Sequence, residues 1–363
     1  MNETIYMPVG EVCSSISDTY REKKNMVTLI NTSDVLEGRV LNHERVPNSN
    51  LKGQFKKTFQ RDDILYSEIR PQNRRFAYVD FSPIDYIAST KLMVIRAKKD
   101  VVSPKYLYYF LKNSSTVAEL QLLAETRSGT FPQITFSEVA NLTIPVPPLA
   151  VQEVIVQTMQ CLEDKTICNE QINDNLEQQA QAIYHERFET VSPNDLPSDW
   201  RIVTLGEVAT ISNKSFYPLK EPEILLEHYS IPAFDEARFP VFELSTSIKS
   251  NKFIIDASCF MISKLNPTTK RVWKPYCLTG NAVCSTEFIV YKAKDQSITD
   301  FLYSVIDSGS FSDFMCSHVT GSTGSRQRTT PSDTLSYELI LPSEDELAEF
   351  QSLVSPMYAQ MRI

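Results

Sequence analysis

The stretch Ile144-Pro-Val-Pro-Pro-Leu-Ala-Val-Gln-Glu-Val-Ile155 marks the point where an extended segment ends and a long helix is predicted to begin. Its three prolines do not fit a helix interior, whereas residues 149–189 contain neither proline nor glycine and are mostly good helix formers. About forty residues rising 1.5 Å each would form a rod of about 60 Å. Helices in globular proteins average about a dozen residues. We therefore interpret this helix as a spacer between two bodies; the alternative is a surface helix of one domain.

A row of residues spaced by seven runs along the predicted helix: Ile155, Leu162, Asn169, Leu176 and Ile183. Such a row forms a stable seam only when a partner helix covers it. A polar residue in the middle of the row is typical of a position that sets helix register. The second row of a coiled coil is interrupted by Thr158, Lys165 and Gln179. The sequence therefore predicts a partner-helix seam on one face of the helix.

Length and composition exclude several classes of protein. A chain of 363 residues fits two domains and a connector, and 42% hydrophobic residues suffice for packed cores. The seven cysteines form no C-x-x-C pair and the four histidines show no metal-ligand spacing, so we expect a reduced, cytoplasmic protein without a metal site. We find no secretion signal and no apolar run of about 18 residues, so we expect no membrane association.

Charge is distributed unevenly along a chain whose net charge is −9. Residues 1–148 hold 19 Lys/Arg and 16 Asp/Glu, whereas residues 149–199 hold 2 and 10. The acidic surplus thus lies mainly on the predicted helix. DNA binding depends on a local basic face rather than on the net charge of the chain, so an acidic total does not exclude it.

An internal repeat runs through the chain at one constant offset. Gly10-Glu-Val12 recurs as Gly206-Glu-Val208, and Ser89-Thr90 recurs as Ser285-Thr286. Further pairs at the same offset are Ser67/Ser263, Pro71/Pro267 and Arg75/Arg271. A constant offset over a whole segment indicates duplication of one domain.

Each copy is predicted to mix strands and helices. Alternating or continuous apolar runs predict strands at 64–69, 76–79, 91–95, 260–265 and 287–291, and a helix at 104–113. We therefore predict an α+β protein with two homologous globular α/β domains, residues 1–148 and 200–341. A long α-helix at 149–190 and a linker at 191–199 would join them. Residues 342–363 would begin a second, shortened spacer helix antiparallel to the first.

Three motifs resemble one known family. They are Arg61-Asp-Asp-Ile-Leu-Tyr-Ser-Glu-Ile-Arg-Pro71, Gly129-Thr-Phe-Pro-Gln-Ile134, and the proline-rich segment before the long helix. With the duplicated domain, they make nearly the whole chain resemble the specificity subunit of type I restriction-modification systems. The resemblance implies that each domain is a target recognition domain reading half of a split DNA target. It also implies that two antiparallel helices separate the halves and bind methyltransferase subunits. The short C-terminal segment departs from that pattern, because a full helix is expected there.

Two basic turns follow equivalent predicted strands and are the first candidates for DNA contacts. They hold Arg70, Arg74 and Arg75 in the first copy and Lys270, Arg271 and Lys274 in the second. Guanidinium and ammonium groups suit phosphate contacts, and guanidiniums also suit bidentate reading of guanine edges. The alternative is a solvated surface turn.

Two further sets of residues extend the predicted DNA-binding surface. Lys23 and Lys24 suit nonspecific phosphate contacts, or else lie on a solvated face. Equivalent polar loops carry Arg127, Ser128 and Thr130 in one copy and Arg326, Gln327 and Arg328 in the other. These loops can contact DNA or support the fold of their own domain, and the sequence leaves both roles open.

No motif in the sequence indicates catalysis. There is no glycine-rich phosphate loop, and Asn266-Pro-Thr-Thr269 is not the Asn-Pro-Pro-Tyr motif of adenine methyltransferases. We therefore expect a non-enzymatic chain without a cofactor, with S-adenosylmethionine bound by a partner. The resemblance implies double-stranded DNA, DNA methyltransferase subunits and a restriction or translocase subunit as partners. The competing hypotheses are a protein scaffold that clamps two partners without DNA and, disfavoured by the missing motifs, an autonomous nuclease or methyltransferase.

Overall fold

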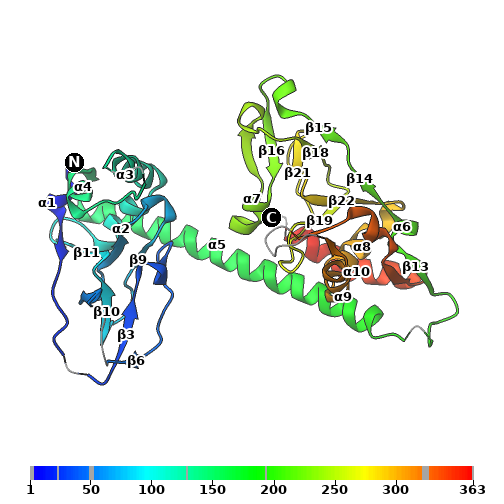
Figure 1. The fold of residues 1–363 in the computed structure, drawn as a ribbon, viewed down its shortest axis with the longest axis horizontal. Coiled ribbons are helices and arrows are strands. Elements are labelled where there is room, and N and C mark those ends of the chain that lie inside the picture. Colours follow the sequence, from blue (N-terminus) through cyan, green and yellow to red (C-terminus); the bar gives the residue numbers. More distant parts are fainter. Residues whose placement is uncertain are drawn as a thin grey trace. The chain divides into compact units, whose positions relative to one another are not determined.

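The computed structural model describes residues 4–22, 24–48, 53–127, 130–192, 194–320 and 327–361. The chain divides into two compact units, unit 1 at residues 1–166 and unit 2 at residues 167–363. Each unit combines helices and sheets (Figure 1), which confirms the predicted α+β class.

One antiparallel sheet forms the centre of unit 1. Its strands lie in the order β2 (Cys13–Ile16), β11 (Leu92–Ala97), β8 (Ile64–Ser67) and β9 (Phe76–Tyr78). Tyr66 and Ile95 belong to a core shared with α2 (Pro104–Lys112) and α3 (Ser114–Arg127), whereas Leu65 and Val94 join a second core on the other face. Because both faces are covered, β8 and β11 begin with continuous apolar runs, residues 64–66 and 92–95, rather than alternating ones.

A second sheet of unit 1 has the order β6 (Val46–Pro47), β3 (Met26–Ile30), β10 (Tyr86–Ser89) and β7 (Phe55–Lys57). Strand β10 is parallel to β3 and antiparallel to β7. We call the part of a unit built on this sheet its distal lobe, and the part with the first sheet and the helices its proximal lobe. Figure 1 shows β3 and β6 at the end of unit 1 opposite α3 and α4 (Phe136–Asn141).

The proximal lobe of unit 2 repeats that of unit 1. Its sheet has the order β14 (Ala209–Ser212), β22 (Phe288–Ala293), β19 (Cys259–Ser263) and β20 (Val272–Trp273). Strands β14 and β22 follow β2 and β11 at the offset of the sequence repeat, as predicted. In both units the first strand pairs with the last, β1 (Ile5–Pro8) with β12 (Thr143–Val146) and β13 (Arg201–Thr204) with β25 (Glu338–Leu341).

Short helices follow β1 and β13, and their close packing against neighbouring helices requires the repeated glycine. In α1 (Val9–Val12) a Cβ on Gly10 would lie 3.0 Å from the Cβ of Ala140 in α4. In α6 (Leu205–Val208) a Cβ on Gly206 would lie 3.2 Å from the carbonyl of Leu335 in the 3-10 helix Pro331–Ser336. A side chain at either position would push these helices apart, so the glycine permits close backbone packing.

The distal lobes of the two units differ more than the proximal lobes. The unit 2 sheet has five strands, β15 (Ser215–Phe216), β18 (Lys252–Ile254), β21 (Ala282–Ser285), β16 (Leu225–Tyr229) and β17 (Val241–Leu244). Strand β21 keeps the offset of the repeat from β10, but β16 begins later than that offset from β3 predicts. The additional α7 (Ile231–Ala237) and edge strand β17 follow β16.

The remaining helices also match the duplication. In unit 2, α8 (Thr299–Ile306) and α9 (Gly309–Ser317) follow β22 as α2 and α3 follow β11, and a short hairpin of β23 (Val319–Thr320) and β24 (Arg328–Thr329) comes next. The predicted long helix is α5 (Leu149–Tyr184), which ends in a π-helical turn at His185–Glu189.

Helix α10 (Glu344–Gln360) packs antiparallel to the C-terminal part of α5 within unit 2. Arg187 binds Glu346 and Glu349 at the start of α10, with N–O distances of 3.6 and 2.7 Å. The rings of Tyr184 and Phe350 lie 6.3 Å apart. About two turns before Tyr184 in α5, Glu177 lines a small cavity with Tyr358 and Met361. The predicted start of a second antiparallel helix is therefore confirmed.

Candidate nucleic-acid interface

Three loops of unit 1 meet at the end of β8, and we call residues 67–70, 89–91 and 130–135 the unit 1 loop junction. The Ser67 hydroxyl accepts a bond from the Ile69 amide at 3.0 Å, which turns the chain as it leaves the strand. The Glu68 amide donates to the Lys91 carbonyl at 3.0 Å, and the Ile134 amide donates to the Glu68 carbonyl at 2.9 Å. Main-chain bonds to residue 68 thus tie the three loops together.

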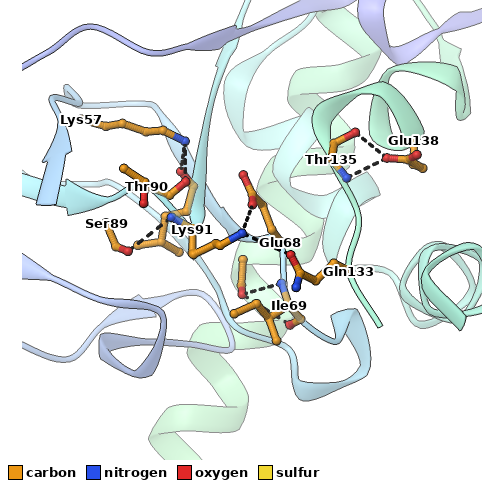
Figure 2. Close-up of polar contacts among 11 residues, drawn as sticks. Lys57, Glu68, Ile69, Ser89, Thr90, Lys91, Gln133, Thr135 and Glu138 are labelled. Atoms are coloured by element: carbon orange, nitrogen blue, oxygen red, sulfur yellow. Dashed lines mark hydrogen bonds and ion pairs between the residues drawn. The ribbon is translucent and has the colours of Figure 1, made fainter. Parts of the chain in front are cut away.

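The side chains at this junction form a polar cluster. Lys91 Nζ lies 3.4 Å from Glu68 Oε2 and 3.2 Å from Gln133 Oε1 (Figure 2). Lys57 Nζ donates to the carbonyls of Thr90 and Leu92 at 3.0 and 2.8 Å. Burial lowers the pKa of Lys57, an effect that Glu68 opposes and Lys91 reinforces. Two ammonium groups therefore share the environment of one carboxylate.

Unit 2 has an equivalent loop junction, residues 263–266, 285–287 and 327–329. The Ser263 hydroxyl accepts from the Leu265 amide at 3.2 Å, and the Lys264 amide donates to the Glu287 carbonyl at 2.9 Å. Here the charges are exchanged, because Lys264 replaces Glu68 and Glu287 replaces Lys91. Glu287 binds the guanidinium of Arg328 through both oxygens, at 3.0 and 3.1 Å.

Both junctions contain a residue in the left-handed backbone region. Arg70 has φ 44°, and Asn266, the equivalent residue of unit 2, has φ 49°. Their amides donate to the carbonyls of Pro132 and Gln327 at 3.1 and 2.9 Å. Asparagine adopts this conformation readily, whereas arginine does so only under strain, so the surrounding bonds must hold Arg70 in it. The Arg70 guanidinium is exposed and forms no hydrogen bond or ion pair with the described residues.

The structure places the other basic candidates of unit 1 beside protein acceptors. Arg74 lies 3.6 Å from Glu37 and 3.3 Å from the Ser114 hydroxyl, and Arg75 donates to the carbonyl of Ser33 at 3.0 Å. Arg127 binds Glu138 at 2.7 Å, and Lys24 lies 3.9 Å from Glu22 at an exposed position. Thr130 is exposed. Lys23 and Ser128 lie outside the described residues.

The candidate DNA-binding cations of the basic turn in unit 2 each pair with an aspartate. Lys270 lies 2.8 Å from the buried carboxylate of Asp307 and donates to its main-chain carbonyl. Arg271 binds both oxygens of Asp235 at 2.6 and 2.8 Å, and Lys274 pairs with Asp300. The Gln327 carbonyl accepts from Asn266 within the loop junction, and Arg326 lies outside the described residues.

Burial of Asp307 has an electrostatic consequence for Lys270. Its carboxylate is nearly inaccessible at the end of α8, and burial raises its pKa to about 6 although Lys270 lowers it. Ion pairs with Asp307, Asp235 and Asp300 give the predicted basic turn of unit 2 a role in its own fold. The part of Lys270, Arg271 and Lys274 in DNA binding stays a prediction.

Sequence reasoning missed Lys91 and Glu287 as members of the two loop junctions. The only signal in the sequence was the exchange of charge between Glu68/Lys91 and Lys264/Glu287 at the constant offset of the repeat. Such an exchange indicates that the two positions contact each other, because reversal of one charge is compensated by reversal of the other.

The predicted seam on α5 divides between two environments. Ile155, Leu162 and Asn169 are exposed, whereas Leu176 is half-buried and Ile183 packs against the core of unit 2. The face of α5 that packs on unit 1 instead carries Val156 and Gln152. Gln152 is fully buried, accepting from the Ser103 amide at 2.8 Å and donating to the carbonyls of Val101 and Pro147.

Two absences in the described part of the chain concern membranes and metals. No helix there is both long and apolar enough to cross a membrane. No group of three or more His, Cys, Asp or Glu side chains is arranged there to hold a metal ion.

Comparison with known proteins identifies the N-terminal part of the chain. Residues 5–178 match the family model of the type I restriction modification DNA specificity domain. This segment is therefore similar to that family. The resemblance inferred from the motifs is thereby confirmed for unit 1 and the first part of α5.

Individual relatives agree with the specificity-domain assignment. Over 167 residues the chain is 42% identical to the specificity subunit of the type I restriction enzyme HindI from Haemophilus influenzae, covering 46% of this chain and 36% of the relative. Over 156 residues it is 24% identical to a putative type I specificity subunit, MjaX, from Methanocaldococcus jannaschii, covering 40% and 36%. The matched segments thus span about a third of these relatives.

A solved structure extends the likeness in fold to the whole chain. The type I restriction-modification S subunit from M. genitalium aligns over 99% of this chain and 90% of its own, with a TM-score of 0.53 and 14% identity. At this identity the likeness concerns the fold alone.

Proposed function

We propose that the chain is the non-catalytic DNA-recognition subunit of a type I restriction-modification complex, with unit 1 reading one half of a bipartite target and unit 2 the other. The observation that carries the proposal is the duplication. Unit 1 matches the model of a DNA specificity domain, and unit 2 repeats its strand order and its loop junction. Two copies of one DNA-reading architecture on one chain suit a target with two separated halves.

The distribution of charge supports a contact between unit 1 and DNA. Residues 17–60, which supply most of the distal lobe, hold eight Lys/Arg and five Asp/Glu, so this segment carries a surplus of three positive charges. The exposed Arg70 adds a cation at the loop junction. Lysine and arginine side chains supply the salt-dependent phosphate contacts on which DNA affinity depends.

In this proposal the chemistry belongs to partner chains. DNA methyltransferase subunits would bind S-adenosylmethionine and methylate adenine, and a restriction or translocase subunit would cleave the DNA. The seam residues Ile155 and Leu162, which are exposed on α5, would contact a helix of such a partner. The purified chain alone should transfer no label from S-adenosylmethionine to DNA, and transfer by the pure chain would contradict this part of the proposal.

Methylation-sensitive sequencing of DNA from cells that carry this chain with its methyltransferase partner tests the bipartite reading. We expect methylated adenines in one sequence with two defined halves and a spacer of fixed length. Insertion of seven residues after Asn169 adds about 10 Å of helix. At about 3.4 Å per base pair, we expect a spacer about three base pairs longer with unchanged halves. A functional insertion variant that keeps the original spacer would contradict the role of α5 as a ruler.

The scaffold hypothesis predicts a different response to salt. If the chain clamps only proteins, its binding to duplex DNA will be absent. If its cations neutralise phosphates, the logarithm of the binding constant should fall linearly with the logarithm of salt concentration. Titration of labelled duplex at several salt concentrations therefore separates the two hypotheses.

A further inference from the structure

The same connection in both units carries a strongly exposed aliphatic side chain. Residues 79–85 join β9 to β10 in unit 1, and residues 274–281 join β20 to β21 in unit 2. Ile84 in the first connection is 74% exposed and Leu278 in the second is 61% exposed. No other large apolar side chain in the described part of the chain is as exposed as Ile84. We call these two connections the tip loops.

A buried carboxylate fixes the tip loop of unit 2. Glu227 in β16 is fully buried, and its carboxylate accepts bonds from the amides of Leu278 and Thr279 at 3.0 and 2.8 Å and from the Thr279 hydroxyl at 3.1 Å. A buried carboxylate is costly unless hydrogen bonds satisfy it. Because the loop supplies most of these bonds, movement of the loop would leave Glu227 unsatisfied.

A tyrosine beside Glu227 adds further restraint to the same loop. The Tyr229 hydroxyl donates to Glu227 at 2.5 Å and accepts from the amides of Tyr276 and Cys277, both at 2.8 Å. Cys277 has φ 49°, a conformation that a non-glycine residue adopts only under restraint. The side chain of Leu278 is therefore displayed from a loop that several hydrogen bonds to Glu227 and Tyr229 restrain.

The tip loop of unit 1 is fixed at the equivalent place by different residues. The Thr28 amide of β3 donates to the Asp85 carbonyl at 2.9 Å, as the Glu227 amide donates to the Asn281 carbonyl at 3.1 Å. Asp85 has φ 61°, and its carboxylate accepts from Tyr20 at 3.2 Å and Arg45 at 3.3 Å. Both units thus hold a rigid tip loop, but each holds it with its own side chains.

The difference between the proximal and the distal lobes indicates which partner the tip loops contact. Surfaces that bind two copies of the same methyltransferase should be alike in both units, and the outer strands of the proximal sheets keep the constant offset of the repeat. Surfaces that read the two halves of a target should differ, because the halves differ in sequence. The strands on either side of the tip loops keep the constant offset, but residues 79–85 and 275–281 differ at every position. The tip loops also lie beside distal sheets in which β16 departs from the offset of β3.

We propose that Ile84 and Leu278 are base-contacting residues, each reading the half-site of its own unit. An exposed aliphatic group recognises DNA by contact with the methyl group of thymine or by insertion between base pairs. Neither contact needs a charged side chain, and the phosphate contacts come from other residues. Glu227 is a positioning residue that acts through the tip loop of unit 2. The inference rests on the proposed function.

Alanine variants test the inference in the assembled methyltransferase complex. Ile84→Ala should change the methylated sequence, by about tenfold or more in preference, only in the half-site read by unit 1. Leu278→Ala should do so only in the other half. Leu122→Ala and Leu219→Ala are matched controls, because these leucines are 62% and 64% exposed elsewhere in units 1 and 2. The controls should leave both halves unchanged.

Glu227→Gln distinguishes a role in positioning the tip loop from a role in folding alone. The amide keeps the shape of the side chain but accepts fewer bonds from the loop amides. We expect a relaxed base preference in the unit 2 half and an unchanged unit 1 half. Equal loss of methylation at every sequence would assign Glu227 to folding alone and overturn its positioning role.

The possible outcomes separate the inference from the proposed function. A wild-type complex that methylates a bipartite site, with both tip variants reading the same bases as wild type, overturns the inference and leaves the proposed function intact. Weaker methyltransferase association with unchanged base preference assigns the tips to a protein contact and also overturns it. A wild-type complex without sequence-specific methylation overturns both.

Discussion

The two loop junctions share a backbone but exchange their charges. In both, a serine hydroxyl turns the chain after the strand and a main-chain amide bonds the facing turn. Yet the ion pair is Glu68 with Lys91 in unit 1 and Glu287 with Arg328 in unit 2. The comparison teaches that main-chain bonds define this architecture, whereas different residues can form the ion pair. A basic residue near a junction is therefore not by itself evidence of a DNA contact.

Equivalent positions of β11 and β22 form ion pairs that differ in burial. Arg96 in β11 binds both oxygens of Asp63 at 2.7 Å, and that carboxylate is 1% exposed. Lys292, the equivalent residue of β22, binds Asp256, which is 56% exposed. The same position thus carries a buried pair in unit 1 and a solvated pair in unit 2.

The largest predicted effect follows from that difference. Asp63→Ala should lower the unfolding free energy of unit 1 by about 3 kcal/mol, because it leaves the Arg96 charge partly buried without a partner. Asp256→Ala should cost unit 2 less than about 1 kcal/mol. The two tryptophans, Trp200 and Trp273, both lie in unit 2. Urea unfolding followed by fluorescence therefore reports unit 2, and circular dichroism reports both units.

The expected pattern is an earlier dichroism transition in Asp63→Ala with an unchanged fluorescence transition. Equal costs of the two substitutions, each measured in its own unit, would show that burial does not distinguish these ion pairs.

A pH-dependent prediction comes from Asp307, the partner of Lys270. Its pKa of about 6 in the folded chain lies above the ordinary value of 3.8. The folded state therefore binds more protons than the unfolded state between about pH 4 and 6, and the contribution of this group to stability falls as pH rises through that window. Across this window, Asp307→Asn should gain about 3 kcal/mol relative to wild type.

Fluorescence-detected unfolding of wild type and Asp307→Asn at several pH values measures this gain. The difference between the two should grow from pH 4 to pH 6 and then level off. A constant difference would show that Asp307 titrates normally in the folded chain.

Local features of the fold were predictable from the sequence. Prolines 147 and 148 mark where α5 begins, because they exclude the preceding residues from the helix interior. The repeated Gly10 and Gly206 marked equivalent close packing, and the repeated Ser67 and Ser263 marked equivalent turns. These signals act over a few residues, so the sequence displays them directly.

The ion pairs of the candidate site were not predictable in the same way. Lys270 and Asp307 are separated by 37 residues. Their contact depends on where α8 ends relative to β19, which is a consequence of packing. The sequence correctly showed a basic turn, but nothing in it indicated that a buried acid lies beneath. Charge counting thus overestimates exposed cations wherever a fold brings distant acids close.

A smaller effect is expected from reversal of the unit 1 pair. Lys91→Glu places a carboxylate beside Glu68 and should cost about 1 kcal/mol, because the pair is partly exposed. Adding Glu68→Lys recreates the charge order of unit 2 and should recover most of that loss. The unit 1 transition in circular dichroism measures both variants. If the double variant is no more stable than Lys91→Glu, the two side chains are not coupled, and their exchange between units is coincidental.

The smallest effect on folding, and the most direct test of DNA contact, concerns Arg70 against Arg74. Arg70 is exposed without a partner among the described residues, whereas Arg74 lies beside Glu37 and Ser114. Arg70→Ala should change stability by less than about 0.5 kcal/mol and weaken duplex binding by on the order of 1 kcal/mol. Loss of one phosphate contact should also reduce the salt slope by about 1.

Arg74→Ala is the matched control, because it removes the same charge from the same turn. Its effect on DNA affinity should be smaller, since its guanidinium already has protein acceptors and would have to leave them to bind phosphate. If Arg74→Ala weakens binding and Arg70→Ala does not, the exposed position is bare surface. In that case the ion pair between Arg74 and Glu37 opens on DNA binding. Exposure alone then does not identify the side chain that binds phosphate.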